Sequence, residues 1–221
     1  MSKPHSVTAL QSILIDNQTQ AVASEAFKSV RTNLLSILSN YEDQSKIICF
    51  TSPEEGSGST VNAVNIAVSF AKMGVKVLLI DTDMRHPGVH PFFNASHTPG
   101  LSECLSGTSS TKDALIVYPE VPKLSILPAG TIPPNPTELI LSTKFNELLN
   151  NAQEQFDYVF IDAPPTCSVT DAAIISSKTL GAILICRSGR TKCDVAQKAK
   201  QIIEQGGGKI IGTILNAVSV K

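Results

Sequence analysis

The chain has no excess of positive charge. Its 18 lysines and arginines are balanced by 19 aspartates and glutamates, which gives a formal net charge of −1. Proteins that bind the phosphate backbone of nucleic acids usually carry a clear basic excess or a basic stripe. We therefore expect no nucleic-acid partner for this protein.

Long hydrophobic runs are missing as well. The longest apolar stretches, such as "VKVLLI" and "GAILIC", have the length of a strand and fall far short of the roughly 20 residues that a membrane-spanning helix needs. The first residues, "MSKPHSVTALQSILIDNQTQ", show no cationic segment followed by a long apolar one, which is the pattern of a secretory signal. We expect a cytoplasmic protein with no membrane-spanning segment of its own.

The cysteines and histidines do not form the spaced sets of a metal site. The five cysteines include no C-x-x-C pair and their number is odd, so reduced and mostly buried thiols are the favoured interpretation. His86, His90 and His97 are irregularly spaced around prolines, and no carboxylate shares a helical face with them. We expect surface histidines rather than metal ligands at these positions.

Short apolar runs alternate with longer amphipathic stretches along the chain. This alternation is typical of strand–helix units around a mainly parallel sheet whose faces are both covered by helices. We therefore predict a three-layer α/β domain. The expected strands cover residues 46–51, 76–81, 123–128, 157–162, 180–186 and 209–214. The expected helices cover residues 20–39, 59–73, 143–154, 170–177 and 191–205.

One domain accounts for almost the whole length. We place it at residues 19–221, and we expect the polar, unpatterned residues 1–18 to form a flexible arm. The segment 83–122 has weak periodicity, which favours loops and short helices on the ligand side. Pro136, which follows "GTIPPN", is expected near the first position of another helix.

The stretch "EEGSGST" at residues 54–60 joins a predicted strand to a predicted helix. A loop of this kind gathers backbone N–H groups and the positive end of a helix at one point, which favours an anion. It also lies at the carboxyl end of a strand, where open α/β sheets bind ligands. Close packing of the turn explains Gly56 and Gly58 equally well. The loop alone therefore leaves a phosphate site and a packed turn as equal alternatives.

Three aspartates near strand ends favour the phosphate site. Asp81 and Asp83 belong to "VLLIDTDMRHP", and Asp162 ends the strand in "FDYVFIDAPP". Carboxylates at the ends of buried strands are costly unless they are paired, and hydrated Mg²⁺ beside a phosphate loop is their natural partner. A capping role explains one such aspartate, but it is a poor explanation for all three.

The stretches "TSPEEGSGST", "VLLIDTDMRHP", "LPAGTIPPNPTELI" and "FDYVFIDAPP" occur in this order. With them the sequence, from about residue 20 to its end, resembles the bacterial tyrosine kinases of capsular and exopolysaccharide synthesis, relatives of the MinD/ParA group of P-loop ATPases. The resemblance implies a three-layer α/β/α P-loop NTPase-like domain that uses ATP and Mg²⁺. It identifies the first stretch as the Walker A loop, the second as the Walker A′ motif and the last as the Walker B strand.

The resemblance also implies a role for each matching residue. Asp81 would be the base that takes the tyrosine proton and would lie near the metal, where Asp83 would be a second acidic group. Asp162 would hold Mg²⁺ through water. Thr60 would place its hydroxyl at the ion, or Ser59 would do so if the register slips by one. The nucleotide-binding residues would be Gly56, Ser57, Gly58, Ser59, Thr60 and, at the adenine, Asn216.

The first predicted helix carries charges that resemble a segment used for ring-like self-association in this family. Glu25, Lys28 and Arg31 repeat at spacings of three and lie on one helical stripe. Contact with a neighbouring subunit is what the resemblance implies, while the charges alone favour a solvated helix face. Lys28 replaces an arginine of the family pattern and lacks its planar fork, which leaves room for a weaker or altered assembly.

The Walker A loop departs from the family pattern at its lysine. Ser59 stands where that lysine carries a full charge to the β- and γ-phosphates, and a hydroxyl cannot neutralise them. Removing one such donor typically costs about 2–4 kcal/mol of transition-state stabilisation, or roughly a hundredfold in rate. Glu54 and Glu55 add negative charge, and Glu54 stands where MinD-type ATPases have a second lysine. Arg85 is the best local candidate for a replacement cation, unless a neighbouring subunit supplies one.

Two functions of different classes fit these features. One is a regulatory family member with weakened or lost tyrosine phosphorylation, which Ser59 and the absence of a terminal tyrosine cluster favour. The other is an active Mg-ATP-dependent protein tyrosine kinase that needs a membrane activator, which the retained aspartates favour. In both cases the resemblance implies a homo-oligomer and a membrane polysaccharide co-polymerase that would hold the protein at the membrane. A ParA/MinD-like positioning ATPase is a more remote alternative, and the "PPNP" segment and the first helix argue against it.

Overall fold

The computed structural model describes residues 21–41 and 46–218 of the chain. The predicted arm at residues 1–18 lies outside these residues. The strands are β1 (Ile47–Thr51), β2 (Val77–Asp81), β3 (Ile116–Val117), β4 (Leu124–Leu127), β5 (Tyr158–Asp162), β6 (Gly181–Arg187) and β7 (Ile210–Asn216). The α-helices are α1 (Ala21–Leu38), α2 (Ser59–Ala71), α3 (Leu101–Ser106), α4 (Thr111–Ala114), α5 (Pro136–Leu141), α6 (Thr143–Gln155), α7 (Asp171–Ser177) and α8 (Cys193–Gln205). Two short 3-10 helices are η3 (Ser39–Tyr41) and η4 (His90–Phe93).

The strands form one sheet with the order β3-β4-β2-β5-β1-β6-β7. Every described pair of neighbouring strands is parallel except β3 with β4, which is antiparallel. The predicted mainly parallel sheet is therefore confirmed, and each predicted strand is present with small shifts at its ends. The sequence did not predict β3, because a strand of two residues is too short to show an alternating pattern.

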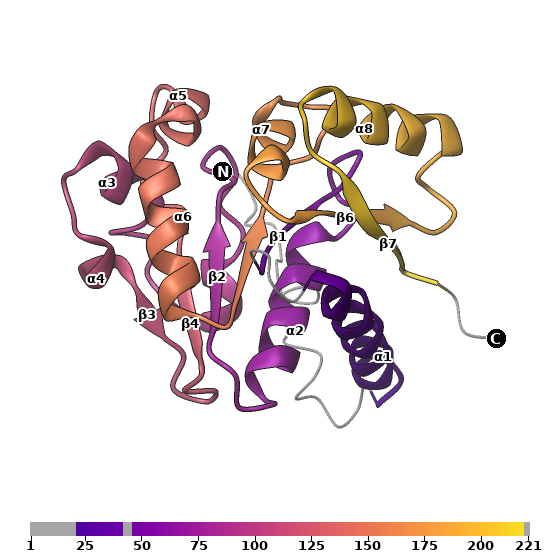
Figure 1. Cartoon of the computed structure of the whole chain (residues 1–221), viewed down its shortest axis with the longest axis horizontal. Helices are drawn as coiled ribbons and strands as arrows, with labels where there is room; N and C mark the ends of the chain where they lie inside the picture. Colours follow the sequence, from indigo (N-terminus) through magenta and orange to yellow (C-terminus); the bar gives the residue numbers. More distant parts are fainter. Residues whose placement is uncertain (1–20, 42–45, 219–221) are drawn as a thin grey trace, which may run out of the picture.

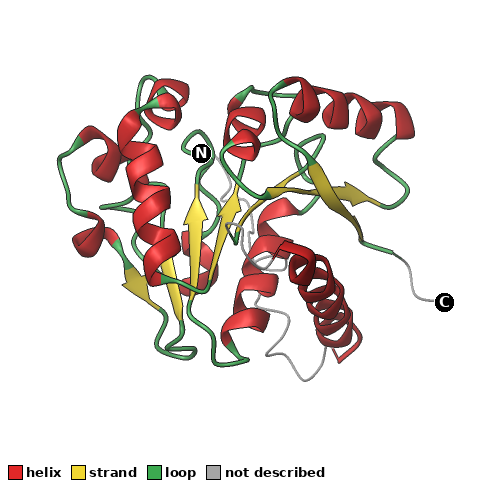
Figure 2. Ribbon diagram, in the orientation of Figure 1, coloured by secondary structure: helices red, strands yellow, loops and turns green. Residues whose placement is uncertain are grey.

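Helices cover both faces of the sheet, as Figures 1 and 2 show. On one face, α1 and α2 contribute Phe27, Leu34 and Phe70 to a core with Phe50 and Phe160 of the sheet. On the other face, α3 to α8 contribute to a second core. These two cores make the predicted three-layer architecture, and α5 begins at Pro136 as expected. Among the described helices, none is both long and apolar enough to cross a membrane.

The order of the strands places the predicted site. Because β1 lies between β5 and β6, the loop after β1 emerges at the carboxyl ends of three neighbouring parallel strands. The adjacent β2 brings its own carboxyl end to the same edge. The helix that follows the loop, α2, is buried from Asn62 to its last residue. The loop is thus held between the central strand and a helix that packs deep in the molecule.

The cysteines are unpaired. Cys49 and Cys186 are buried, Cys104 and Cys167 are partly buried, and Cys193 is exposed. The prediction of mostly buried thiols therefore holds only in part.

Candidate nucleotide site

The loop between β1 and α2 has the backbone of a tight, glycine-dependent cradle. Gly56 and Gly58 have φ angles of +72° and +92°, a region that side chains with a Cβ rarely adopt. Gly58 is also the N-cap of α2. A Cβ there would lie 2.3 Å from the side-chain nitrogen of Asn216. The backbone conformation therefore requires glycine at both positions. At Gly58 the close approach of Asn216 from β7 is a second reason.

Ser59 is the first residue of α2, at the point where the N–H groups of the helix face the loop. Its neighbour Ser57 is buried and donates a hydrogen bond to the carbonyl of Glu54 at 2.8 Å. Glu54 and Glu55 are exposed, so their charges meet solvent. The loop therefore has the shape of a phosphate cradle without a lysine at the helix start.

Asn216 holds this loop from the end of β7. Its side-chain nitrogen donates to the carbonyl of Ser57 at 2.9 Å, and its own carbonyl accepts from the backbone N–H of Ser188 at 2.9 Å. The residue predicted at the adenine therefore lies at the loop, with its amide nitrogen already engaged in a structural contact.

Asp81 and Asp162 lie next to each other at the ends of β2 and β5. Both are buried, with 0% and 1% exposure. Asp81 accepts backbone N–H groups of Gly88 and Val89 on one oxygen, each at 3.0 Å, and that of Asp83 on the other at 3.1 Å. Burial is the largest influence on this carboxyl and raises the pKa of Asp81 to about 7, although these hydrogen bonds act in the opposite direction.

Asp162 differs from Asp81 in having an oxygen without a partner. Its Oδ1 is buried and accepts no hydrogen bond. Burial, followed by the neighbouring charge of Asp81, raises the pKa of Asp162 well above its ordinary value, and the Thr60 hydroxyl lowers it. Thr60 itself lies beside Gly88, whose N–H binds Asp81. The structure thus brings together the predicted metal set of Thr60, Asp81 and Asp162.

These residues fit a magnesium ion that is completed by phosphate and water. A buried carboxylate oxygen without a donor is a natural ligand for a hard cation, and protein Mg²⁺ sites typically use one or two carboxylates together with substrate phosphates. Among the described residues, no group of three or more His, Cys, Asp or Glu side chains forms a metal cluster by itself. The fit therefore depends on a bound nucleotide.

Asp83 and Arg85 belong to the turn after β2. One oxygen of Asp83 accepts the backbone N–H groups of Arg85 and His86, at 3.2 and 2.9 Å, and burial raises the pKa of the Asp83 carboxyl. The Arg85 guanidinium binds Thr137 of α5 at 3.1 Å and lies 3.5 Å from a carboxylate oxygen of Asp171. The predicted replacement cation is therefore held by α5 and the start of α7.

Two arginines that the sequence analysis did not select lie at the loop instead. Arg187, the last residue of β6, donates from its guanidinium to the carbonyl of Gly56 at 2.9 Å. Arg190 approaches the same glycine, since its guanidinium nitrogen lies 3.4 Å from the place of a Cβ on Gly56. A signal was present in the sequence, because the apolar run "GAILIC" is followed directly by "RSGR", which carries both arginines.

The charges predicted for self-association lie on α1. Glu25 and Lys28 are exposed and form an ion pair at 2.5 Å. Arg31 instead donates to the backbone and side-chain oxygens of Ser69 on α2, at 3.0 and 3.2 Å. Two members of the predicted stripe are thus accessible, while the third is engaged within the chain.

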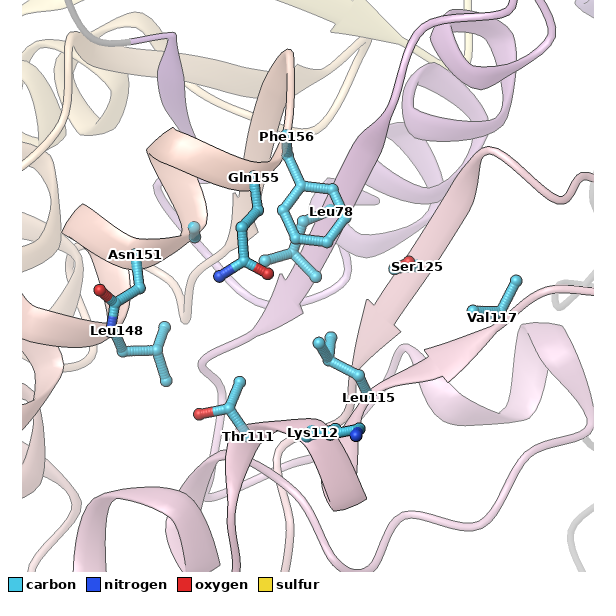
Figure 3. A pocket seen from close by; sticks show the side chains of 11 residues that line it. Leu78, Thr111, Lys112, Leu115, Val117, Ser125, Leu148, Asn151, Gln155 and Phe156 are labelled. Carbon is cyan, nitrogen blue, oxygen red and sulfur yellow. The ribbon is translucent and has the colours of Figure 1, made fainter.

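One pocket in the structure is separate from this site. It has a volume of about 410 Å³ and lies between α6 and the segment from α4 to β4. Figure 3 shows a lining of apolar and polar side chains, with Leu78, Leu115, Leu148 and Phe156 among the apolar ones. None of the residues predicted to bind nucleotide lines this pocket.

The parallel sheet, the glycine loop after β1 and the aspartates that end β2 and β5 define a P-loop ATPase domain. A family model described as an AAA domain matches residues 45–188. The cell-division ATPase MinD of Pyrococcus furiosus has the same fold, with a TM-score of 0.65, 22% identity, and coverage of 78% of this chain and 72% of that chain.

The chain belongs to the bacterial tyrosine-protein kinase family. It is 41% identical over 196 residues to the tyrosine-protein kinase CpsD of Streptococcus agalactiae, covering 88% of this chain and 82% of the relative. It is 36% identical over 206 residues to the tyrosine-protein kinase YwqD of Bacillus subtilis, covering 93% and 86%. The crystal structure of the chimerical protein CapA2B2 matches with a TM-score of 0.87 and 34% identity, covering 96% of this chain and 94% of that chain.

Proposed function

We propose that this protein binds Mg-ATP at the loop after β1 and regulates the synthesis and export of capsular or exopolysaccharide. We further propose that its transfer of phosphate to tyrosine is weakened, because Ser59 replaces the Walker A lysine. The family membership supports the nucleotide and the tyrosine substrate class. Membership of the family that includes CpsD of Streptococcus agalactiae, 41% identical to this chain, supports the role in polysaccharide synthesis.

One observation carries this proposal: the acidic half of the site is complete, while the cationic half is altered at the start of α2. Asp81 and Asp162 are buried side by side, with Thr60 beside them. Burial raises the pKa of the Asp81 carboxyl in the absence of a cation, and a raised pKa makes this carboxylate a better acceptor for the proton of a tyrosine hydroxyl. Ser59 offers only a hydrogen bond to the transferred group, whose growing charge a lysine would neutralise.

The metal has a limited part in this proposal. When bound, Mg²⁺ neutralises phosphate charge and orients the phosphates. Asp162 and Thr60 would hold it, with Asp81 close by. The unpartnered oxygen of Asp162 supports this assignment. Asp83 and Arg85 fix the turn that follows Asp81, and they therefore contribute by keeping that carboxylate in place.

The partner class follows from the family rather than from the site. We propose that a membrane polysaccharide co-polymerase chain binds the protein and holds it at the cytoplasmic face of the membrane. The similarity to the chimerical protein CapA2B2 supports a partner of this kind. We also propose a homo-oligomer formed through Glu25, Lys28 and Arg31. The exposure of Glu25 and Lys28 supports this contact, and Arg31 would have to leave Ser69 to join it.

A second candidate function is a fully active tyrosine kinase that waits for its membrane activator. The intact group of Asp81, Asp162 and Thr60 favours it. The two candidate functions differ in what would restore a normal rate of tyrosine phosphorylation. In a fully active kinase the membrane activator would restore it. In a weakened kinase only a change at residue 59 would do so.

The test is phosphate transfer from radiolabelled ATP to a synthetic glutamate–tyrosine copolymer, measured for the wild type and for Ser59→Lys. We expect the lysine to raise the rate about tenfold or more, because it restores one charged donor at the transferred group. Ser177→Lys adds the same charge at an exposed position of α7 and serves as the matched control. A wild type that is as fast as Ser59→Lys, with or without an activator, contradicts the proposed weakening.

A further inference from the structure

Two arginines flank the phosphate loop from one side, in a site that lacks the usual lysine. Arg187 ends β6, and Arg190 lies in the turn between β6 and α8. Arg187 is bonded to the Gly56 carbonyl at 2.9 Å, and the guanidinium of Arg190 lies in van der Waals range of the open side of that glycine. Because Gly56 has no Cβ, nothing on this residue separates the guanidinium of Arg190 from the backbone of the cradle.

The turn that carries the arginines is well fixed. The backbone N–H of Arg187 donates to the hydroxyl of Thr191 at 2.9 Å, and the carbonyl of Arg187 accepts the N–H groups of Arg190 and Thr191. The N–H of Ser188 joins the turn to Asn216, which itself binds the loop. The arginine turn and the loop are thus connected by two routes, the bond from Arg187 to Gly56 and the chain from Ser188 through Asn216 to Ser57.

The side chain of Arg190 is exposed and accessible to an anionic ligand. Glu54 and Glu55 are exposed and turn toward solvent. Within the described part of the chain, no ion pair or side-chain hydrogen bond engages the guanidinium of Arg190. An arginine fork of this kind binds phosphate oxygens with two parallel hydrogen bonds.

We propose that Arg190 supplies the positive charge that binds the phosphate chain of a nucleoside diphosphate or triphosphate in this protein, and that Arg187 positions the loop. This inference rests on the proposed function, because it assigns further residues to the same nucleotide site. The arginines approach from the Gly56 side, whereas the missing lysine would extend from the start of α2. They therefore favour binding of the phosphates and leave the transferred group without its usual charge, which agrees with a site that binds ATP but transfers phosphate slowly.

The experiment compares ATP, ADP and adenosine binding to the full chain, measured by calorimetry in the presence of Mg²⁺. For Arg190→Gln we expect ATP affinity to fall about tenfold or more, ADP affinity to fall less, and adenosine affinity to stay unchanged, because the lost contact is to phosphate. Arg190→Lys should recover part of the ATP affinity. Lys192→Gln removes the same charge at an exposed neighbour, and we expect it to leave all three affinities within about twofold of wild type.

Arg187 requires a readout of loop order, since its proposed role is positioning. Arg187→Gln should speed hydrogen exchange of the backbone amides from Gly56 to Ser59 and weaken ATP binding, and Arg187→Lys should reverse part of both effects. If wild type binds ATP and Arg190→Gln binds it equally well, the inference is wrong and the proposed function stands. If wild type binds neither ATP nor ADP, the proposed function and the inference both fail.

Discussion

Asp81 and Asp162 are in register on neighbouring parallel strands, and both carboxylates are buried beneath the loop after β1. Their hydrogen bonding is unequal, because Asp81 accepts three backbone N–H groups while one oxygen of Asp162 accepts none. Two adjacent carboxylates without a cation repel each other and resist ionisation. We therefore expect the free energy of unfolding of the nucleotide-free protein to depend measurably on pH.

The first prediction concerns stability in a chelating buffer without nucleotide. The pKa of Asp162 is higher in the folded protein than its ordinary value of 3.8, so the folded state binds this proton more tightly than the unfolded state does. The contribution of Asp162 to the free energy of unfolding therefore becomes less favourable as the pH rises. We expect Asp162→Asn to have a melting temperature at least about 2 °C above wild type near pH 8. The difference should shrink as the pH falls toward about 4.

Asp194→Asn is the control for this prediction, because Asp194 is exposed in the first turn of α8. Scanning calorimetry at several pH values provides the measurement. A stability difference between Asp162→Asn and wild type that does not vary with pH contradicts the assignment of a buried carboxylate pair that resists ionisation.

The second prediction concerns the pH dependence of phosphate transfer. Without a cation, burial raises the pKa of Asp81 to about 7. Bound Mg²⁺ would lower this pKa, so the base is protonated and inactive only below neutral pH. We expect the rate to rise as the pH increases from about 5 to about 7, and Asp81→Asn to lower it roughly a hundredfold or more. Initial rates with saturating ATP give this profile, and a flat profile in wild type excludes Asp81 as the base.

The third prediction concerns the contact that holds Arg85. Its guanidinium lies 3.5 Å from Asp171, whose side chain is 1% exposed, while that of Arg85 is 36% exposed. We expect a double-mutant cycle with Arg85→Ala and Asp171→Ala to give a coupling free energy of about 1 kcal/mol, reduced by solvent screening on the arginine side. Urea unfolding of the four proteins measures it. Additive effects of the two substitutions would mean that the contact does not hold the turn after β2.

Local patterns in the sequence were sufficient for most of the fold. The buried strands and the longer helices each have their own periodicity, and the loop between Thr51 and Ser59 has its own glycines, so their types and positions could be predicted. The aspartates at strand ends could be assembled into one site because parallel strands bring their carboxyl ends to one edge. The short α3, α4 and β3 were missed as individual elements, because elements of so few residues do not show a hydrophobic periodicity.

The cationic side of the site could not be predicted in the same way. Arg85 is next to the acidic motif in sequence, yet its guanidinium turns toward Asp171 and Thr137. Arg187 is 131 positions away from Gly56 and contacts it directly. Which cation reaches the loop depends on how the turn after β6 is oriented, and that orientation is fixed by tertiary contacts with β7 rather than by local sequence.

The contact between Asn216 and the phosphate loop joins residues that are synthesised at different times during translation. The ribosome makes the loop early, but Asn216, the partner of Ser57, is added 159 positions later. A nascent chain that lacks β7 has no bond from Asn216 to steady its glycines. We therefore expect the loop to reach its final conformation only after β7 has been synthesised and has paired with β6.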